Sequence, residues 1–331
     1  MLDMDRVMHT FSVAPMMDWT DRYCRAFHRM LSRHALLYAE MVVADAVIHG
    51  ERARLIGFDS REHPVAAQLG GSDPARLAEA ARILEDFGYD EINLNVGCPS
   101  DRVQSGWFGA CMMAKPELVA ECFSAMQGAV SVPVTIKCRI GIDAQDPYEA
   151  LPVFVETVKR AGCPTFIIHA RKAWLEGLSP KDNRTIPPLD YELVRQVKRD
   201  HPDLTVILNG GLETLEQAKT EAQGLDGVML GRAAYHTPWI LTGVDEMFYG
   251  GKPFLQTREQ IIENLIDYAR SLEQNDPGIR ALPRHIMGLM HGQKGARLWR
   301  QKLSEPARGR PVSTRIKAAW QALQAARERA A

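Results

Sequence analysis

The sequence lacks the features of a secreted, membrane-spanning or zinc-binding protein. Only six of its 331 residues are cysteine, and no two cysteines are spaced as Cys-x-x-Cys. A zinc site is therefore not expected. The simplest interpretation is that the six cysteines are reduced thiols in a cytoplasmic protein. No run approaches the roughly 18 apolar residues of a membrane span, and the first residues lack the order of a secretory signal. We expect a cytoplasmic protein that binds no metal, does not associate with a membrane and has no stable protein partner.

The chain has little net charge, but its charge is unevenly distributed. The formal charge is −1 for the whole sequence. Residues 280–331 contain twelve Lys or Arg and two Glu, a balance of +10, so the remainder carries −11. A basic segment attached to an acidic body indicates a polyanionic partner. A solvated helical face is the alternative that charge alone leaves open.

Short apolar runs rich in β-branched residues recur in the first 232 residues and predict strands. Such continuous runs are typical of strands buried on both faces of a parallel sheet. Helical patterns lie between most of them, and Asp73 followed by Pro74 has the residue types of a helix start. Eight strands alternating with helices favour a (β/α)₈ TIM barrel, and no GxGxxG motif follows the first strand to suggest an open dinucleotide-binding sheet. The eight runs are Val13–Met16, Leu36–Val42, Val65–Gly70, Glu91–Val96, Val134–Arg139, Thr165–Ala170, Thr205–Asn209 and Gly227–Gly231.

The pattern changes beyond the eighth strand. Amphipathic helices are predicted at Thr257–Glu273 and Ile316–Glu328, with an interrupted helical stretch at Pro283–Leu303. No strand pattern is present in this part of the sequence. We therefore predict a catalytic barrel domain at residues 1–250 and a small all-helical domain at residues 251–331.

Two reactive side chains are predicted at the active-site face, where the carboxyl ends of barrel strands meet. Lys137 lies in an apolar run on the fifth strand. It could form a Schiff base, place positive charge beside a flavin, or pair with a barrel carboxylate. Cys98 follows the fourth strand, where a thiol could be an acid or a nucleophile. Residues 105–113 could form a mobile lid over this cysteine.

Glycine turns follow the last two strands and predict a phosphate site. Gly210 and Gly211 follow the seventh strand, and Gly231 with Arg232 follows the eighth. Glycine lets main-chain N–H groups approach an anion, and barrels commonly bind phosphate here. His169, near the end of the sixth strand, could be a metal ligand, or a hydrogen-bond partner of phosphate or of a core group. No cluster with metal-ligand spacing surrounds it, so no metal is expected.

Together these segments resemble the tRNA-dihydrouridine synthases, in that family's order and across the whole barrel. The matching stretches are Val13–Asp18, Ala67–Gly71, Asn93–Ser100, Thr135–Arg139, Ile168–Arg171, Asn209–Gly211 and Gly231–Arg232. Three further stretches resemble the family's A branch, which modifies positions 20 and 20a in the D-loop of tRNA. They are His169–Trp174, Gly177–Arg184 with Pro187–Leu189, and Gly295–Arg300.

The resemblance implies an FMN cofactor that is reduced by NADPH. The flavin would pass hydride to C6 of uracil while Cys98 protonates C5, and the flipped-out base would reach the barrel mouth. The basic helical domain would bind tRNA phosphates. The implied flavin contacts are Pro15, Met16, Met17 and Gln68 at the ring and ribityl chain, Lys137 at the N1/O2 edge, and His169, Asn209, Gly210, Gly211, Gly231 and Arg232 around the phosphate. The implied tRNA contacts are Asn95, Asp182, Arg184, Thr185, Arg297 and Arg300.

Three other functions share part of this pattern. A small-molecule flavin reductase of the dihydroorotate dehydrogenase type has the same barrel, FMN and a pyrimidine ring, but has no use for a basic polyanion-binding segment. A Schiff-base aldolase would use Lys137. A non-catalytic RNA-binding protein would not need Lys137, Cys98 and two phosphate turns at one rim.

Overall fold

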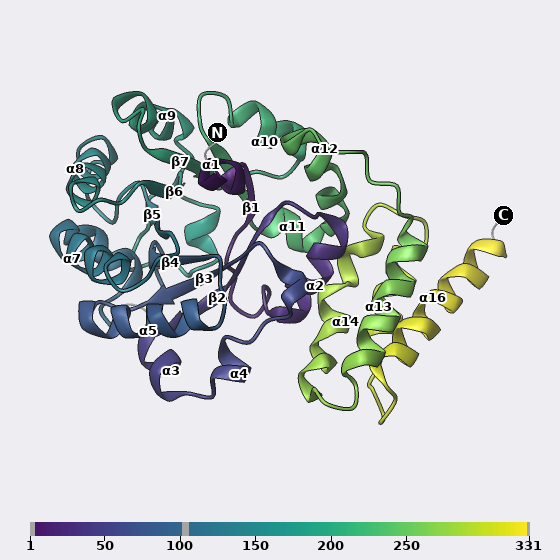
Figure 1. Cartoon of the computed structure of the whole chain (residues 1–331). Helices are drawn as coiled ribbons and strands as arrows, with labels where there is room; N and C mark the ends of the chain where they lie inside the picture. Colours follow the sequence, from purple (N-terminus) through teal and green to yellow (C-terminus); the bar gives the residue numbers. More distant parts are fainter. Residues whose placement is uncertain (1–3, 101–105, 330–331) are drawn as a thin grey trace.

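Eight parallel strands close into a barrel, which confirms the predicted (β/α)₈ architecture. The computed structural model describes residues 4–100 and 106–329. Each strand pairs with the next along the chain, and β8 returns to β1 (Figure 1). The strands are β1 (Phe11–Val13), β2 (Leu36–Val43), β3 (Val65–Gly70), β4 (Glu91–Val96), β5 (Val134–Arg139), β6 (Thr165–His169), β7 (Thr205–Asn209) and β8 (Gly227–Leu230).

The first strand differs most from its prediction. It covers Phe11–Val13 instead of Val13–Met16 because the chain turns at Met16. The main-chain oxygen of Met16 accepts hydrogen bonds from the N–H groups of Trp19 and Thr20, both at 3.0 Å. The N–H of Met16 in turn donates to Thr20 Oγ1 at 2.9 Å. These local bonds remove Met16 from the strand ladder and leave it at the rim of the barrel.

Side chains fill the inside of the barrel. A buried cluster there draws on β2, β3, β6, β7 and β8, and includes Tyr38, Ile167 and Met229. A second and larger buried cluster lies between the strands and the surrounding helices. Every residue of β3, β4, β7 and β8 is buried, as the continuous apolar runs predicted. The barrel is therefore a packed core with room for a ligand at its mouth.

Helices surround the strands (Figure 1). The predicted cap of α5 is present, because the Asp73 side chain accepts from the N–H groups of Ala75 and Arg76 and Pro74 follows it. Among the described residues up to 249, the α-helices are α1 (Met4–His9), α2 (Arg22–Leu31), α3 (Ala44–His49), α4 (Arg52–Leu55), α5 (Pro74–Asp86), α7 (Pro116–Gln127), α8 (Pro147–Arg160), α9 (Tyr191–Asp200), α10 (Leu215–Glu221), α11 (Arg232–His236) and α12 (Val244–Tyr249). The 3₁₀ helices are η1 (Ser60–Glu62), η2 (Gly109–Ala114), η3 (Asp182–Arg184) and η4 (Pro238–Gly243).

The last part of the chain is helical and lies at one side of the barrel, next to α2 (Figure 1). Its α-helices are α13 (Arg258–Leu272), α14 (Leu282–His285), α15 (Ala296–Ser304) and α16 (Val312–Glu328), with 3₁₀ helices η5 (Pro277–Ala281) and η6 (Met287–Met290). The interrupted stretch is confirmed, since η6 separates α14 from α15. The final helix begins four residues before the predicted Ile316, directly after Pro311. The domain boundary at residue 250 stays a prediction.

One carboxylate joins the C-terminal helices to the barrel. Asp21 caps α2 by accepting from the N–H groups of Tyr23 and Cys24. Its other oxygen lies 3.0 Å from Arg284 Nη2 and 2.8 Å from His285 Nε2. The start of α2 is thereby bonded to α14.

Two negative findings apply to the described residues. None of their helices combines the length and apolarity needed to cross a membrane. Within the same residues, no group of three or more His, Cys, Asp or Glu side chains is placed to hold a metal ion.

Candidate active site

A cavity of about 810 Å³ lies at the carboxyl ends of the strands, where the sequence predicted the active site. Three groups of sequence-predicted residues line it. The implied flavin contacts there are Pro15, Met16, Met17, Gln68, Lys137, His169, Asn209, Gly210, Gly211, Gly231 and Arg232, joined by Cys98 and by the implied tRNA contacts Asn95 and Arg184. Four implied tRNA contacts are absent from the lining, namely Asp182, Thr185, Arg297 and Arg300.

Cys98 is held at the rim by bonds to its main chain. Its N–H donates to Asn95 Oδ1 at 3.0 Å, and its carbonyl oxygen accepts from Ala110 N at 3.0 Å. The thiol is half-buried, and its Sγ lies 3.5 Å from Ser100 Oγ. All six cysteines lie in the described part of the chain, and Cys98 alone among them lines the cavity. Position therefore separates this thiol from the other five.

Part of the predicted lid packs against the barrel. Residue 105, its first residue, lies outside the described residues. Four of the six residues of η2 are buried, and η2 packs against β4. The bond from Ala110 N makes η2 a support for Cys98, and movement of this segment as a lid stays a prediction. Phe108 is also buried, whereas Trp107 is exposed.

Two cationic side chains, half-buried Lys137 and buried Arg139, lie near the thiol. Burial, and then the charge of Arg139, lower the pKa of Lys137 to about 8. No carboxylate pairs with Lys137 among the described residues, so the predicted alternative of a structural ion pair is wrong. Burial lowers the pKa of Arg139 to about 10, which still leaves it charged at neutral pH. The cavity thus carries positive charge at its base.

Arg139 also connects two loops. Its Nε donates to the carbonyl oxygen of Gly97 at 3.1 Å, in the loop that carries Cys98. Its Nη1 donates to the carbonyl oxygens of Lys172 at 3.2 Å and Asn183 at 2.8 Å. One guanidinium therefore fixes the cysteine loop relative to residues 172–184.

The glycine turn after β7 approaches His169 closely. Gly210 has φ +116°, and a Cβ added to it would lie 2.6 Å from His169 Cδ2. Gly211 has φ +68°, and its Cβ would lie 2.4 Å from Leu189 Cδ1. Both positions require glycine, for conformation and for space. Burial and the charges of Arg139 and Lys137 hold the pKa of His169 well below its usual value, so its ring is neutral at pH 7.

Apart from Asn95, which lines the cavity, the implied tRNA contacts fall into three groups. Arg184 reaches the cavity, and its carbonyl oxygen accepts from Arg232 Nη2 at 3.2 Å. Asp182 and Thr185 bond within their own loop, with Asp182 Oδ2 accepting from Ser179 Oγ at 2.7 Å and Thr185 Oγ1 donating to main-chain oxygens. Arg297 and Arg300 are exposed on α15. Their contacts with tRNA stay predictions.

Some lining residues were missed from the sequence. Met41 enters the cavity because the β2–β3 register shifts between Tyr38 and Met41. Asp18 and His236 line it from the turn after β1 and from α11. A bulge has no clear sequence signature, and a lone Asp or His in a loop carries none. A strand-end rule finds residues on regular strands and misses those delivered by irregular ones.

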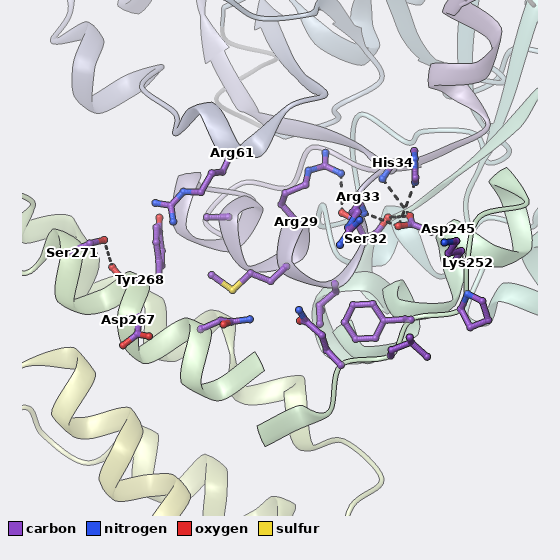
Figure 2. A pocket seen from close by; sticks show the side chains of 18 residues that line it. Arg29, Ser32, Arg33, His34, Arg61, Asp245, Lys252, Asp267, Tyr268 and Ser271 are labelled. Carbon is purple, nitrogen blue, oxygen red and sulfur yellow. Dashed lines mark hydrogen bonds and ion pairs between the residues drawn. The ribbon is translucent and has the colours of Figure 1, made fainter. Parts of the chain in front are cut away.

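A second hollow, of about 970 Å³, lies near the amino-terminal end of β2, away from the barrel mouth. Figure 2 shows Asp245 and His34 on one side of it and Tyr268 on the other. Asp245 accepts from Ser32 Oγ at 2.6 Å and from the N–H of Arg33 at 2.9 Å. None of the predicted site residues lines this hollow. The predicted chemistry is concentrated at the barrel mouth.

Comparison with known proteins agrees with the geometry. The family model described as dihydrouridine synthase (Dus) matches residues 12–326. A protein of Shewanella oneidensis named tRNA-dihydrouridine(20/20a) synthase is 52% identical over 323 residues, covering 97% of this chain and 96% of that protein. Proteins of the same name from Vibrio cholerae and Yersinia pestis are 54% and 55% identical, over 89% and 91% of this chain and 90% and 87% of their own lengths. Since these matches extend over nearly the whole sequence, the chain belongs to the dihydrouridine synthase family.

Proposed function

We propose that this chain reduces the C5–C6 double bond of uridine in tRNA to give 5,6-dihydrouridine, at positions 20 and 20a of the D-loop. Its family supports the reaction, and the names of its relatives support the positions. The observation that carries the proposal is the setting of Cys98. It is the one cysteine that lines a cavity also lined by Lys137, Arg139, Arg184 and Arg232.

The lining of the cavity fits FMN. Its lining includes four cationic side chains and two carboxylates, Asp18 and Glu213, and this excess of positive charge suits a phosphate. Gly210 has no Cβ, so its main chain can lie close to His169, and a glycine turn of this kind lets main-chain N–H groups approach an anion. We propose that Pro15, Met16, Met17, Gln68 and Lys137 hold the ring system and ribityl chain, and that His169, Asn209, Gly210, Gly211, Gly231 and Arg232 surround the phosphate.

Once bound and reduced by NADPH, FMN would supply a hydride, that is, the electron pair together with the hydrogen that C6 of the uracil accepts. Cys98 supplies the proton, which passes from Sγ to C5 of the uracil. The bonds to Asn95 Oδ1 and Ala110 N hold the cysteine main chain in place, and such positioning lowers the barrier to proton transfer. Lys137, with a pKa of about 8, is mostly protonated at pH 7. Its positive charge would stabilise negative charge on a carbonyl oxygen of the ring bound at the base of the cavity.

The tRNA must present a single base to this cavity. A volume of about 810 Å³ admits a flavin ring and one base, but not a folded loop, so the uridine must leave its stack. We propose that Asn95 and Arg184, which both line the cavity, contact the base or its phosphate. We propose that Arg297 and Arg300 on α15 bind the tRNA backbone, and that the loop containing Asp182 and Thr185 contacts the tRNA partly through its main chain.

One observation favours a second function. A lysine with a lowered pKa, such as Lys137, is also suited to Schiff-base chemistry. Borohydride would then trap a carbonyl substrate on Lys137, and the purified protein would be colourless. A small-molecule flavin reductase would be yellow as well, but it would leave tRNA unchanged.

The proposal is tested by mapping dihydrouridine in tRNA from cells that lack the gene. We expect the 2 Da mass increment of uridine reduction to be missing at positions 20 and 20a, and to return when purified protein, FMN and NADPH are added. Unchanged dihydrouridine in the deletion strain would exclude this substrate. The small-molecule reductase would then be the better interpretation.

A further inference from the structure

A row of buried polar side chains connects the interior of the barrel to the loop that carries the cysteine. It runs from Glu91 on β4 through Thr135, Asn93 and Gln68 to Asn95, and each of these side chains is at least 92% buried. The strand register places Gln68 beside Asn93 and Asn93 beside Thr135. An unpaired polar group costs free energy in a buried site, so a row of this kind stabilises the fold when its members bond to one another.

The buried end of the row has a defined donor direction. Glu91 Oε1 accepts from Tyr38 Oη at 2.5 Å and from Thr135 Oγ1 at 2.6 Å. His9 Nε2 lies 2.9 Å from the other carboxyl oxygen. A threonine hydroxyl has one hydrogen, and here the hydroxyl donates it in the hydrogen bond to Glu91 Oε1. Thr135 Oγ1 can therefore only accept from Asn93 Nδ2, which lies 2.8 Å away.

The end near the cavity has the same direction. The N–H groups of Gly97 and Cys98 donate to Asn95 Oδ1 at 3.2 and 3.0 Å. The Nδ2 of Asn95 must then face Gln68 Oε1, at 2.8 Å, and Gln68 Nε2 donates to Asn93 Oδ1 at 2.7 Å. Main-chain N–H groups cannot accept a hydrogen bond. Rotating the side-chain amide of Asn95 or Gln68 by 180° would therefore point its NH₂ group at another donor. Both ends of the row therefore require the same orientation of the three amides, with each nitrogen pointing toward the acceptor of the next side chain.

This direction decides what the cavity wall offers to a ligand. Gln68 and Asn95 both line the cavity. Each amide nitrogen has two hydrogens, and the row uses one of them. The second hydrogen of each is available to the cavity, where it suits the carbonyl oxygens of a pyrimidine-dione ring, which both FMN and uracil contain.

We infer that Glu91 and Thr135 are positioning residues that fix Gln68 and Asn95 as hydrogen-bond donors toward a pyrimidine-dione ring in the cavity. Neither Glu91 nor Thr135 lines the cavity, so both act through the amides. The identity of the ring rests on the proposed function, whereas the donor direction does not. The bonds at the buried end fix this direction independently of the bonds made by the cysteine loop.

The test compares Thr135→Val with Thr135→Ser. Valine has the shape of threonine but cannot accept from Asn93, so the row is fixed from the cavity end alone and its buried end is left without an acceptor, whereas serine keeps the hydroxyl. We expect FMN titration of the apoprotein to give a Kd about tenfold weaker for Thr135→Val and within about twofold of wild type for Thr135→Ser. The infrared carbonyl bands of bound FMN should move to higher frequency in Thr135→Val alone. Thr165→Val, a buried change on β6 outside the row, is the matched control.

Three outcomes separate this inference from the proposed function. Equal affinities of Thr135→Val and Thr135→Ser for both FMN and tRNA would overturn the inference. A weaker affinity for tRNA alone would support it and assign the donors to uracil. Wild-type apoprotein that binds no FMN would overturn the proposed function instead. Should Thr135→Val not fold, neutron diffraction from wild-type crystals decides the matter, because oxygen in place of ND₂ at Gln68 Nε2 would contradict the donor direction.

Discussion

Arg139 Nη1 donates a hydrogen bond to the carbonyl oxygen of Asn183 at 2.8 Å. The same guanidinium donates to the carbonyl oxygen of Gly97, beside the proposed acid. Asn183 is fully buried, and its amide bonds to the main chain of Trp174 in both directions, as acceptor at 2.7 Å and donor at 2.8 Å. The thiol and the loop proposed to meet tRNA are therefore fixed relative to each other by one side chain.

Replacing Arg139 with Lys should separate these two loops. Lysine keeps the charge but cannot bond to Gly97 and Asn183 at once in the same planar geometry. We expect kcat to fall by about 10-fold to 100-fold, with a stability loss of about 1–3 kcal/mol. Steady-state kinetics and thermal unfolding measure the two effects. Arg160→Lys, an exposed change on α8, is the control, and an equal kcat for both variants would contradict the positioning role.

The affinity for FMN should depend on pH through Lys137. Its pKa in the free protein is about 8, lowered from the usual lysine value mainly by burial. The protonated form attracts an anionic ligand, and it is lost as pH rises through 8, so affinity should fall above that pH. Lys137→Met should bind FMN more weakly at pH 7 and show no such fall between pH 7 and 9. Fluorescence titrations measure this, and identical pH profiles for the two proteins would refute the role of the lysine.

Gly210→Ala should disrupt the proposed phosphate site. Gly224→Ala is a matched control, because both glycines have positive φ but an added Cβ at Gly224 meets nothing within 4 Å. Both changes should cost about 1 kcal/mol for the backbone conformation. Only Gly210→Ala should displace His169 and weaken FMN binding, by about tenfold or more. Similar FMN affinities for the two variants would place the phosphate elsewhere.

The exposed arginines of α15 should contribute to tRNA binding through charge. Changing Arg297 and Arg300 to Ala should weaken tRNA binding and reduce the slope of log K against log salt by about 0.7 to 0.9 for each phosphate group that is no longer neutralised by an arginine. FMN binding should not change, since neither residue lines the cavity. Filter binding at several salt concentrations measures the slope. A slope like that of wild type, or like that of Arg160→Ala, would show that α15 does not bind the tRNA backbone.

The sequence predicted the barrel and much of the cavity lining because both depend on local patterns. Continuous apolar runs define buried strands, and residues at strand ends meet at one face, so Lys137, Cys98 and the glycine turns could be placed together. The role of Glu91 could not be predicted in this way. Its row depends on which residues of β3, β4 and β5 lie side by side, a register set by contacts distant in sequence. Met41 was missed for the same reason, since a bulge delivers it.

The most direct test of the account is a mass measurement on tRNA treated with wild-type protein and with Cys98→Ala. Unmodified tRNA is incubated with each protein, FMN and NADPH, and the D-loop fragment is analysed. Without the thiol proton, we expect Cys98→Ala to bind FMN and tRNA normally but to reduce uridine about 10²-fold to 10⁴-fold more slowly, while Cys111→Ala, which changes a cysteine outside the cavity, resembles wild type. Reduction by Cys98→Ala at the wild-type rate would contradict the assignment of Cys98 as the acid.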